Sequence, residues 1–223
     1  MSRVLTTGDL DAPLTRDDVV ALLEARLRSP WYRSQMLDAQ RTLFKPRVVT
    51  TQAELSKLSE TATDGDECYA LADAANGVMW RLRFRAASTS AYRWEFVGGA
   101  ALRQGVETAE SVAASGAYQN LTTAGPQVTL PLAGTYDIAF EAEFQNTTTG
   151  ANHYLSYDLG STGATDAVGI GSNPWAANVP FPIGRRRQIS AAAGDLLNLR
   201  YKAGGGTHQW GKRSVWAIPM RLG

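Results

Sequence analysis

The chain has very little of what cysteine or metal chemistry requires. It has a single cysteine, Cys68, which excludes an intrachain disulfide and a cysteine-based zinc cluster. Its place inside an alternating segment predicts a buried thiol. Only two histidines occur, His153 and His208, and neither belongs to a metal-ligand motif such as HExxH. We therefore predict no metal site and no cofactor, with His153 at a strand end and His208 in an exposed glycine-rich loop.

An excess of charge of one sign and long apolar runs are also lacking. The 223 residues carry a formal net charge of +1, which gives no overall attraction to nucleic acid or to an anionic membrane. No run approaches the roughly 20 apolar residues of a membrane span, and the first residues lack the basic and apolar regions of a secretion signal. We expect no nucleic-acid partner, no membrane partner and synthesis in the cytoplasm.

Recognisable catalytic motifs are lacking as well. The sequence has neither a GxSxG nucleophile elbow nor a GxxxxGK[ST] phosphate loop. Three carboxylates, Asp137, Glu141 and Glu143, share one face of an expected strand, and a carboxylate pair is the machinery of a glycosidase. An outward strand face is also charged simply because it is solvated. We predict that the chain is not an enzyme and has no catalytic residues.

The most informative feature that is present is a run of three short alternating segments between Gly65 and Gly99. Large apolar residues alternate with charged ones, which places the apolar set on one face of each half-buried strand. Asn76-Gly77 is a strong turn signal between the first two segments. The pattern predicts a three-stranded antiparallel meander, covered by a helix or by a neighbouring subunit. Its outward face carries three arginines, Arg81, Arg83 and Arg85. Two glutamates on the flanking strands, Glu67 and Glu95, can pair with them across the sheet.

The end of this run, Trp94 to Gly99 with the sequence WEFVGG, resembles a small β-module that recurs in tail and fibre proteins of bacterial viruses. The resemblance implies a virion part rather than an enzyme. It also implies that the protein is made in the host cytoplasm, resides in the virion and contacts other virion proteins through its N-terminal region.

Helical signals dominate the N-terminal region. After an extended arm, Thr15 begins an amphipathic stripe, and Ser29-Pro30 has the form of an N-cap and first turn of a second helix. Helices this short are marginal alone, so their apolar stripes need a partner. Two interpretations stay open: packing onto the β-module of the same chain, or an oligomer bundle or virion anchor. Thr51 to Glu54 then has capping-box spacing and predicts a two-turn helix.

The C-terminal half consists of short alternating segments separated by Gly-, Asn- and Pro-bearing turns, which predicts a β-sandwich or jelly roll. A stretch poor in large apolar residues, 102–115, is typical of a linker before it. The strand candidates are Gln127 to Leu132, Tyr136 to Phe144, His153 to Leu159, Val179 to Ile189, Leu196 to Tyr201 and Ser214 to Met220.

Three parts of this half resemble the trimeric jelly roll of complement and tumour-necrosis-factor-type domains. They are the turn and strand from Leu132 to Ile138, the turn from Ala193 to Leu196 and the apolar last strand, WAIPMRLG. The resemblance implies a homotrimer with its chain ends at the base. No collagen-like repeat or long heptad region separates the modules, which favours a short spike over a long fibre.

Candidate contacts for a receptor or partner lie in two kinds of segment. The densest charge run, Arg185-Arg186-Arg187, could bind a phosphate, an anionic glycan or an acidic protein, or else lie on a solvated loop or pair with its neighbours across an interface. Two long loops, 160–177 with Trp175 and 204–210 with Trp210, carry aromatic rings suited to stacking on sugars or docking a protein. Their rings could equally close the ends of the sandwich or pack at the trimer axis. The candidate contacts are Trp175, Arg185, Arg186, Arg187, His208 and Trp210.

The sequence thus predicts a mainly β protein in three parts: an N-terminal helical anchor at 1–45, a small antiparallel β-meander at 46–104 and a C-terminal jelly-roll β-sandwich at 105–223. The leading hypothesis is a short fibre, spike or minor tail protein of a tailed bacteriophage, trimeric and exposing a tip to a host glycan or protein. The alternatives are a capsid head fibre or decoration protein, and a module that binds or degrades polysaccharide. A deep cleft holding two of Asp137, Glu141, Asp158 and Asp166 would favour hydrolysis, and a shallow aromatic patch would favour binding.

Overall fold

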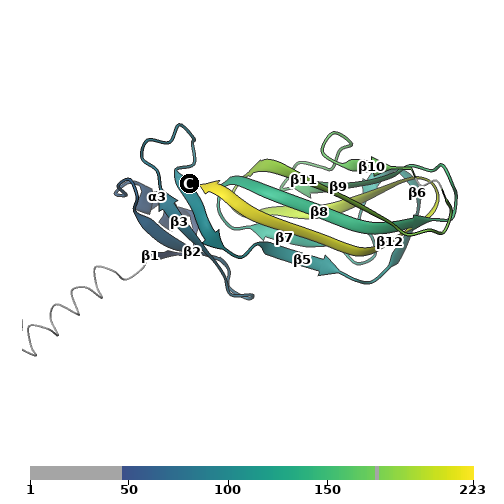
Figure 1. Ribbon diagram of the computed structural model, residues 1–223, viewed down its shortest axis with the longest axis horizontal. Coiled ribbons are helices and arrows are strands. Elements are labelled where there is room, and N and C mark those ends of the chain that lie inside the picture. Colours follow the sequence, from purple (N-terminus) through teal and green to yellow (C-terminus); the bar gives the residue numbers. More distant parts are fainter. Residues whose placement is uncertain (1–46, 174–175) are drawn as a thin grey trace, which may run out of the picture. The chain divides into compact units, whose positions relative to one another are not determined.

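The computed structural model describes residues 47–173 and 176–223. Residues Arg47–Gly223 form one compact unit, and strands make up most of it (Figure 1). The N-terminal anchor predicted for residues 1–45 lies outside the described residues, as does Trp175. The mainly β character expected from the alternating sequence is confirmed.

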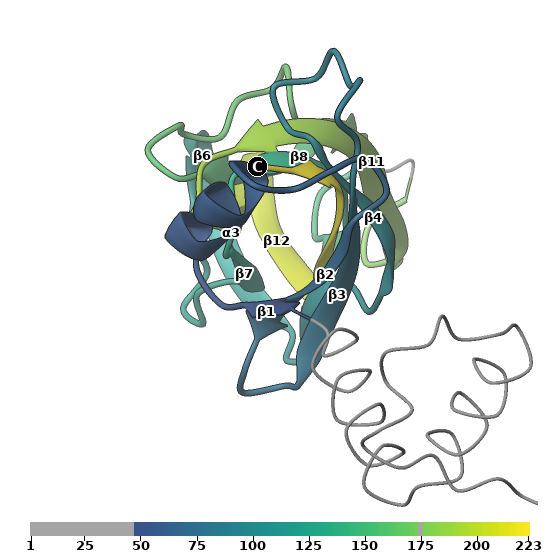
Figure 2. The ribbon, with the colours of Figure 1, turned by 90° about the vertical axis from the view of Figure 1, so that its left-hand side faces the viewer.

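The small β-module has the predicted meander at its centre. Strands β2 (Glu67–Asp73), β3 (Val78–Phe84) and β4 (Trp94–Gly99) pair antiparallel in chain order. A short strand β1 (Arg47–Val49) adds to β2 in parallel. Figure 2 shows this module and its helix in front of the remaining strands.

The cover of the module's apolar face is a helix of the same chain. Helix α3 (Gln52–Ser59) begins at the N-cap Thr51, whose hydroxyl accepts a hydrogen bond from the Glu54 backbone N–H while the Glu54 carboxylate accepts from the N-cap N–H. Leu55 on this helix is fully buried. Ser59 accepts a hydrogen bond of 2.8 Å from the indole N–H of the fully buried Trp94. The capping box and the expected helix are therefore confirmed, and the helix is fixed to β4.

The WEFVGG segment has a clear local reason for its last glycine. Gly99 has φ +134°, and a Cβ there would collide with the backbone oxygen of Met79 on the neighbouring strand β3. Gly98 has open space around it. Trp80, opposite Gly99, is fully buried and donates a 2.9 Å hydrogen bond from its indole N–H to the Ala100 carbonyl. Only the second glycine is thus required by the fold.

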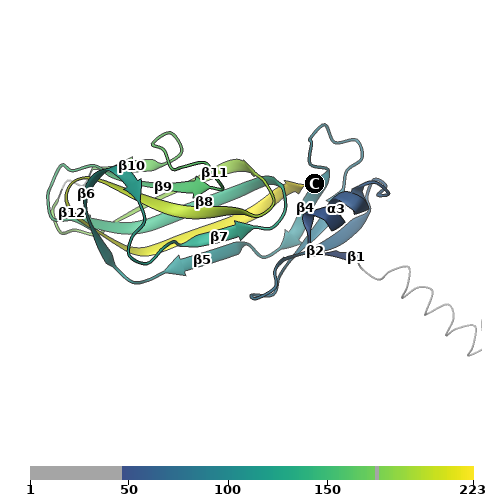
Figure 3. The ribbon, with the colours of Figure 1, turned by 180° about the vertical axis from the view of Figure 1, so that it is seen from behind.

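The rest of the unit is a sandwich of two sheets that share the long strand β12 (Figures 1 and 3). In one sheet the order is β7–β12–β9–β10, and in the other it is β5–β12–β8–β11, with β6 also along β12. Two four-stranded antiparallel sheets connected in this order are a jelly roll. The bounds are β5 Leu102–Val106, β6 Glu110–Gln119, β7 Gln127–Leu130, β8 Gly134–Asn146, β9 His153–Leu159, β10 Ile170–Ser172, β11 Phe181–Ala191 and β12 Asp195–Leu222.

Strand β12 changes sheets along its length. Its first part pairs with β7 and β9, and its later part pairs with β8 and β5. Between these two parts, the pairing of β12 with β6 shifts register twice from Tyr201 to Thr207. Gly206, in the same stretch, has φ 73°. Bulges of this kind bend a strand and let it form the corner of a sandwich. The loop predicted at 204–210 is therefore wrong, because its glycines bend the strand without ending it.

The core lies between the two sheets and is filled by the inward side of β8. Burial alternates without interruption along this strand, with Tyr136, Ile138, Phe140 and Phe144 inside. Phe140 packs edge-on against Tyr157 of β9, with ring centroids 5.4 Å apart. The one-sided strand predicted from the YDIAFEAEF sequence is thus confirmed.

The segment predicted as a linker, 102–115, is structured. It holds β5 and most of β6, both paired with β12, so the linker prediction is wrong. The β6 side chains are exposed or half-buried. An edge strand that buries so little can be built from small residues. The end of β12 also pairs with β4, Leu222 opposite Trp94. The division at residues 104 and 105 stays a prediction, since the described chain crosses it as one compact unit.

Candidate functional site

The arginine run lies on strand β11, at the border between the two sheets. Arg185 and Arg187 point the same way along the strand and donate hydrogen bonds to the carbonyls of Gly169 and Ala167. They therefore fix the segment before β10 against β11. The run therefore lies on a strand and not on a solvated loop, and these two side chains bond to a neighbouring segment of the same chain.

Arg186 faces the opposite way, onto the outer face of the β5–β12–β8–β11 sheet. Its guanidinium forms a two-pronged ion pair with Asp137 of β8, with Nε 2.9 and 2.7 Å from the two carboxylate oxygens. The carboxylate raises the pKa of Arg186. The guanidinium carbon also lies 5.7 Å from the centroid of the Trp216 ring. The Arg186 side chain is 70% exposed, and Arg185 is also exposed, whereas Arg187 is half-buried.

His208 and Trp210 do not lie on an exposed loop. Both side chains belong to β12 and are fully buried. Trp210 packs among Phe144 and Tyr201, with ring centroids 5.5 and 5.1 Å away. The exposed position predicted for His208 is wrong, because the GGGTHQW sequence continues a strand whose side chains face the core. Burial leaves neither ring with a surface that a receptor could contact.

The only two histidines of the sequence meet in this core. His153 Nδ1 lies 2.5 Å from His208 Nδ1, although 55 positions separate the residues. His208 Nε2 bonds to the Gly205 carbonyl, which can only accept, so Nε2 carries the proton of this ring. His208 Nδ1 then accepts a hydrogen bond from the His153 Nδ1–H, and His153 Nε2 is buried without a partner that could stabilise a second proton on this ring. Both rings are therefore neutral.

Burial has a strong effect on this pair. Desolvation, and then the neighbouring His208, lowers the pKa of His153 to about 3. Burial also lowers the pKa of His208, against the bond to Gly205. No carboxylate contributes to either shift. Within residues 47–173 and 176–223, no group of three or more histidines, cysteines or acidic residues is placed to hold a metal ion.

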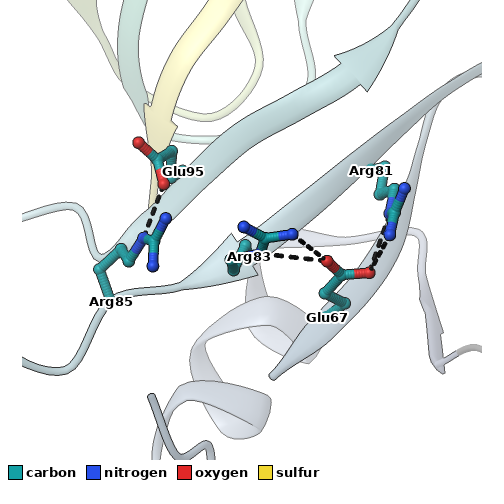
Figure 4. Close-up of polar contacts among 5 residues, drawn as sticks. All are labelled: Glu67, Arg81, Arg83, Arg85 and Glu95. Atoms are coloured by element: carbon teal, nitrogen blue, oxygen red, sulfur yellow. Dashed lines mark hydrogen bonds and ion pairs between the residues drawn. The ribbon is translucent and has the colours of Figure 1, made fainter. Parts of the chain in front are cut away.

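The basic ladder of the small module pairs as its sequence indicates (Figure 4). Glu67 accepts from Arg81 Nη2 at 2.6 Å and from Arg83 Nη2 at 2.8 Å. Arg85 Nε lies 2.7 Å from Glu95. These bonds, first that of Arg83 and then that of Arg81, lower the pKa of Glu67. The ladder ties neighbouring strands together and is structural.

The four carboxylates considered for hydrolysis have different partners. On β8, Asp137 binds Arg186 and Glu141 accepts a 2.7 Å hydrogen bond from the Ser214 hydroxyl. The other two belong to separate ion pairs, Asp158 with Arg200 and Asp166 with Lys202. The absence of enzymatic activity stays a prediction.

Two surface hollows are lined in part by Arg103 of β5. One of about 420 Å³ is polar and lies beside the β2–β3 turn, where its lining includes Asp73, Asn76, Arg103, Gln104 and Gln127. The other, of about 380 Å³, lies on the outer face of the β5–β12–β8–β11 sheet. Its lining is Ala101, Arg103, Glu141, Ser214, Trp216 and Ile218. Sequence reasoning missed this second hollow, although the alternation in SVWAIPM carries the signal for its apolar residues.

These features define a β-sandwich of jelly-roll topology joined to a small β-module. Neither a family model nor a curated protein matches the chain. Solved structures with a similar arrangement include the Eiger TNF of S. frugiperda, with 11% identity, a TM-score of 0.42, and 55% of this chain and 94% of that chain covered. The structure of infectious bursal disease virus Gx strain matches with 13% identity, a TM-score of 0.35 and 65% and 41% coverage.

A carbohydrate-binding domain also has a similar arrangement. The C-terminal CBM6 of LamC, a marine laminarinase of Zobellia galactanivorans, matches with 14% identity, a TM-score of 0.30 and 51% and 98% coverage. Similarity at these levels concerns the sandwich fold and assigns no function. In the described part of the chain no helix is long and apolar enough to cross a membrane.

Proposed function

We propose that this chain is a structural component of a tailed bacteriophage particle, namely a short fibre, spike or minor tail protein. The N-terminal region attaches it to other virion proteins, and the jelly roll is the exposed tip, which contacts a glycan or protein of the host surface. The observation that carries the proposal is the direct union of a WEFVGG module with a jelly roll, since Leu222 at the end of β12 pairs with Trp94. The tip and the module thus form one β-structure without a flexible linker.

The proposal includes assembly as a homotrimer. Support comes from the jelly-roll strand order and from the strand β12 outer face, where Met220 is 39% exposed and Trp216 and Ile218 are half-buried. Apolar residues gathered on one face are a common feature of protein interaction surfaces. A trimer would bring three tips together above three N-terminal regions.

Immunogold electron microscopy of purified particles tests this role. Antibodies against residues 47–223 should label one position on the tail, and the protein should sediment with particles through a density gradient. Label distributed over the capsid would instead favour the alternative of a head fibre or decoration protein. Protein that stays in the soluble fraction, with unlabelled particles, would refute a virion role.

The other alternative, a module that binds or degrades polysaccharide, has a separate test. The purified chain is incubated with cell-surface polysaccharide, and reducing ends and bound protein are measured. We expect no new reducing ends. Release of oligosaccharides would refute the assignment as a structural protein.

A further inference from the structure

The outer face of the β5–β12–β8–β11 sheet carries an apolar strip along β12. Val215 and Ala217 point into the core and are fully buried, so the residues between and beyond them point outward. These outward residues, Trp216, Ile218 and Met220, are the apolar strip. An outward strand face of an isolated sandwich is normally polar, so this strip calls for a partner surface.

Two opposite charges flank the apolar strip without an ion pair. Arg103 on β5 lies opposite Trp216, and no hydrogen bond or ion pair of its side chain occurs in residues 47–173 and 176–223. Glu141 on β8 lies opposite Ser214, whose hydroxyl is the sole partner of its carboxylate within the same ranges. Both side chains line the 380 Å³ hollow with Trp216.

The two charges cannot readily neutralise each other within one molecule. Strand β12 lies between β5 and β8, and Arg103 is level with Trp216 whereas Glu141 is level with Ser214, so their backbones are about 12 Å apart from the usual strand spacing and rise. The Trp216 side chain lies on the same face and lines the same hollow. Other charges of this face are already paired, Arg186 with Asp137 and Lys212 with Glu143.

We propose that a second copy of this chain covers the apolar strip, and that Arg103 of one copy forms an ion pair with Glu141 of the next. The inference rests on the homo-oligomer of the proposed function and names the surface that forms it. Charge complementarity favours a second copy over another partner, because each copy offers one cation, one anion and an apolar strip. A strongly acidic or basic partner would bring a like charge against one of the two flanks.

The positions of the charges also suit a closed ring. The cation lies on one flank of the apolar strip and the anion on the other, so copies related by rotation can place each Arg103 against the Glu141 of a neighbour. The apolar strips then meet near the axis. Contacts of this head-to-tail kind form a ring where the rotation between copies closes, and a closed ring leaves no charged flank unpaired.

Charge reversal in the full-length chain tests the proposal. The variants are R103E, E141R and the double variant R103E/E141R, with R93E as a matched control, because Arg93 is exposed and lies on the segment before β4. Circular dichroism confirms folding of each variant. Light scattering over a dilution series gives the mass and the concentration at which the oligomer dissociates.

We expect each single reversal to raise the dissociation midpoint by about tenfold or more, because it sets like charges together. The double variant should return to within about twofold of the natural chain, and R93E should not change it. As an independent variant, W216A should weaken the oligomer without changing the pairing of the charges.

The outcomes separate this inference from the proposed function. A natural chain that is monomeric at all concentrations overturns the homo-oligomer and this inference together, while a virion role is still decided by particle labelling. A natural chain that is oligomeric, with R103E, E141R and W216A all as stable as R93E, overturns the inference alone. In that case the copies meet elsewhere, and the strip is free for a glycan or a host protein.

Discussion

Mild acid should destabilise the tip through the buried pair of His153 and His208. Both rings are neutral in the folded protein, and the Nδ1–Nδ1 bond requires one unprotonated nitrogen. In the unfolded chain each histidine takes up a proton near its ordinary pKa of 6.5. The unfolded state therefore binds more protons than the folded state below that pH, so the free energy of unfolding falls as the pH falls.

The size of the effect follows from the pKa of His153. With a folded value of about 3, this ring stays neutral throughout mild acid while its unfolded form is charged. Each pH unit below 6.5 then costs about 1.4 kcal/mol, so His153 alone removes about 2 kcal/mol at pH 5. His208 acts in the same direction. Against a typical domain stability of about 5–15 kcal/mol, this loss is readily measured.

Urea unfolding at pH 7.5 and pH 5.0 measures the loss. Glu67 and Asp166 stay ionised in this window, since hydrogen bonds from arginine side chains lower the pKa of Glu67 and the hydrogen bond from Lys202 lowers the pKa of Asp166. A 2 kcal/mol loss lowers the urea midpoint by about 1 M. In the variant H153Q, whose amide can still donate to His208, the loss should shrink by about 2 kcal/mol. Equal stability of the natural chain at both pH values, or an unchanged loss in H153Q, would refute the reasoning.

Three further predictions concern the small module. Gly99→Ala should destabilise the protein by about 1–3 kcal/mol in urea unfolding because of its positive φ and the collision with the Met79 carbonyl, whereas Gly98→Ala should be within about 0.5 kcal/mol of the natural chain. Ser59→Ala leaves the buried indole N–H of Trp94 without its acceptor and should cost about 1–3 kcal/mol, measured in the same way; a loss below about 0.3 kcal/mol would show that the bond is dispensable. Burial raises the pKa of the Cys68 thiol to about 12, so a thiol reagent at pH 8 should label it only after denaturation, and rapid labelling of the native protein would contradict its buried position.

The strands with strict alternation could be predicted from the sequence. In β8 every second residue is buried, and β9 occupies His153–Leu159 as expected, because period-two hydrophobicity records which face is buried. The capping box at Thr51 likewise predicted the helix that covers the meander. In each case the signal lies in residues that are close together in the sequence.

What could not be predicted depends on tertiary context. The composition of residues 102–115 is typical of a linker, yet β5 and β6 form because the long β12 offers an edge to pair with. The glycines at 204–206 are typical of a loop, yet they allow a bend inside β12. Nothing in the sequence shows that His153 and His208 are opposite each other, since that depends on how β12 passes between the sheets.

The candidate site was predicted only in part for the same reason. The arginine run drew attention to β11, but only Arg186 lies on the outer face of the β5–β12–β8–β11 sheet, while Arg185 and Arg187 hold the segment before β10. Arg103, Glu141 and Trp216 come from three strands whose order the sequence does not reveal. Their common hollow became visible only when the sheet was assembled.

The solution mass of the full-length chain, measured by light scattering across a concentration series, tests the central claim most directly. A trimeric tip predicts a particle of three times the 24.0 kDa chain mass that persists on dilution into the micromolar range. A particle of 24.0 kDa at every concentration would contradict it.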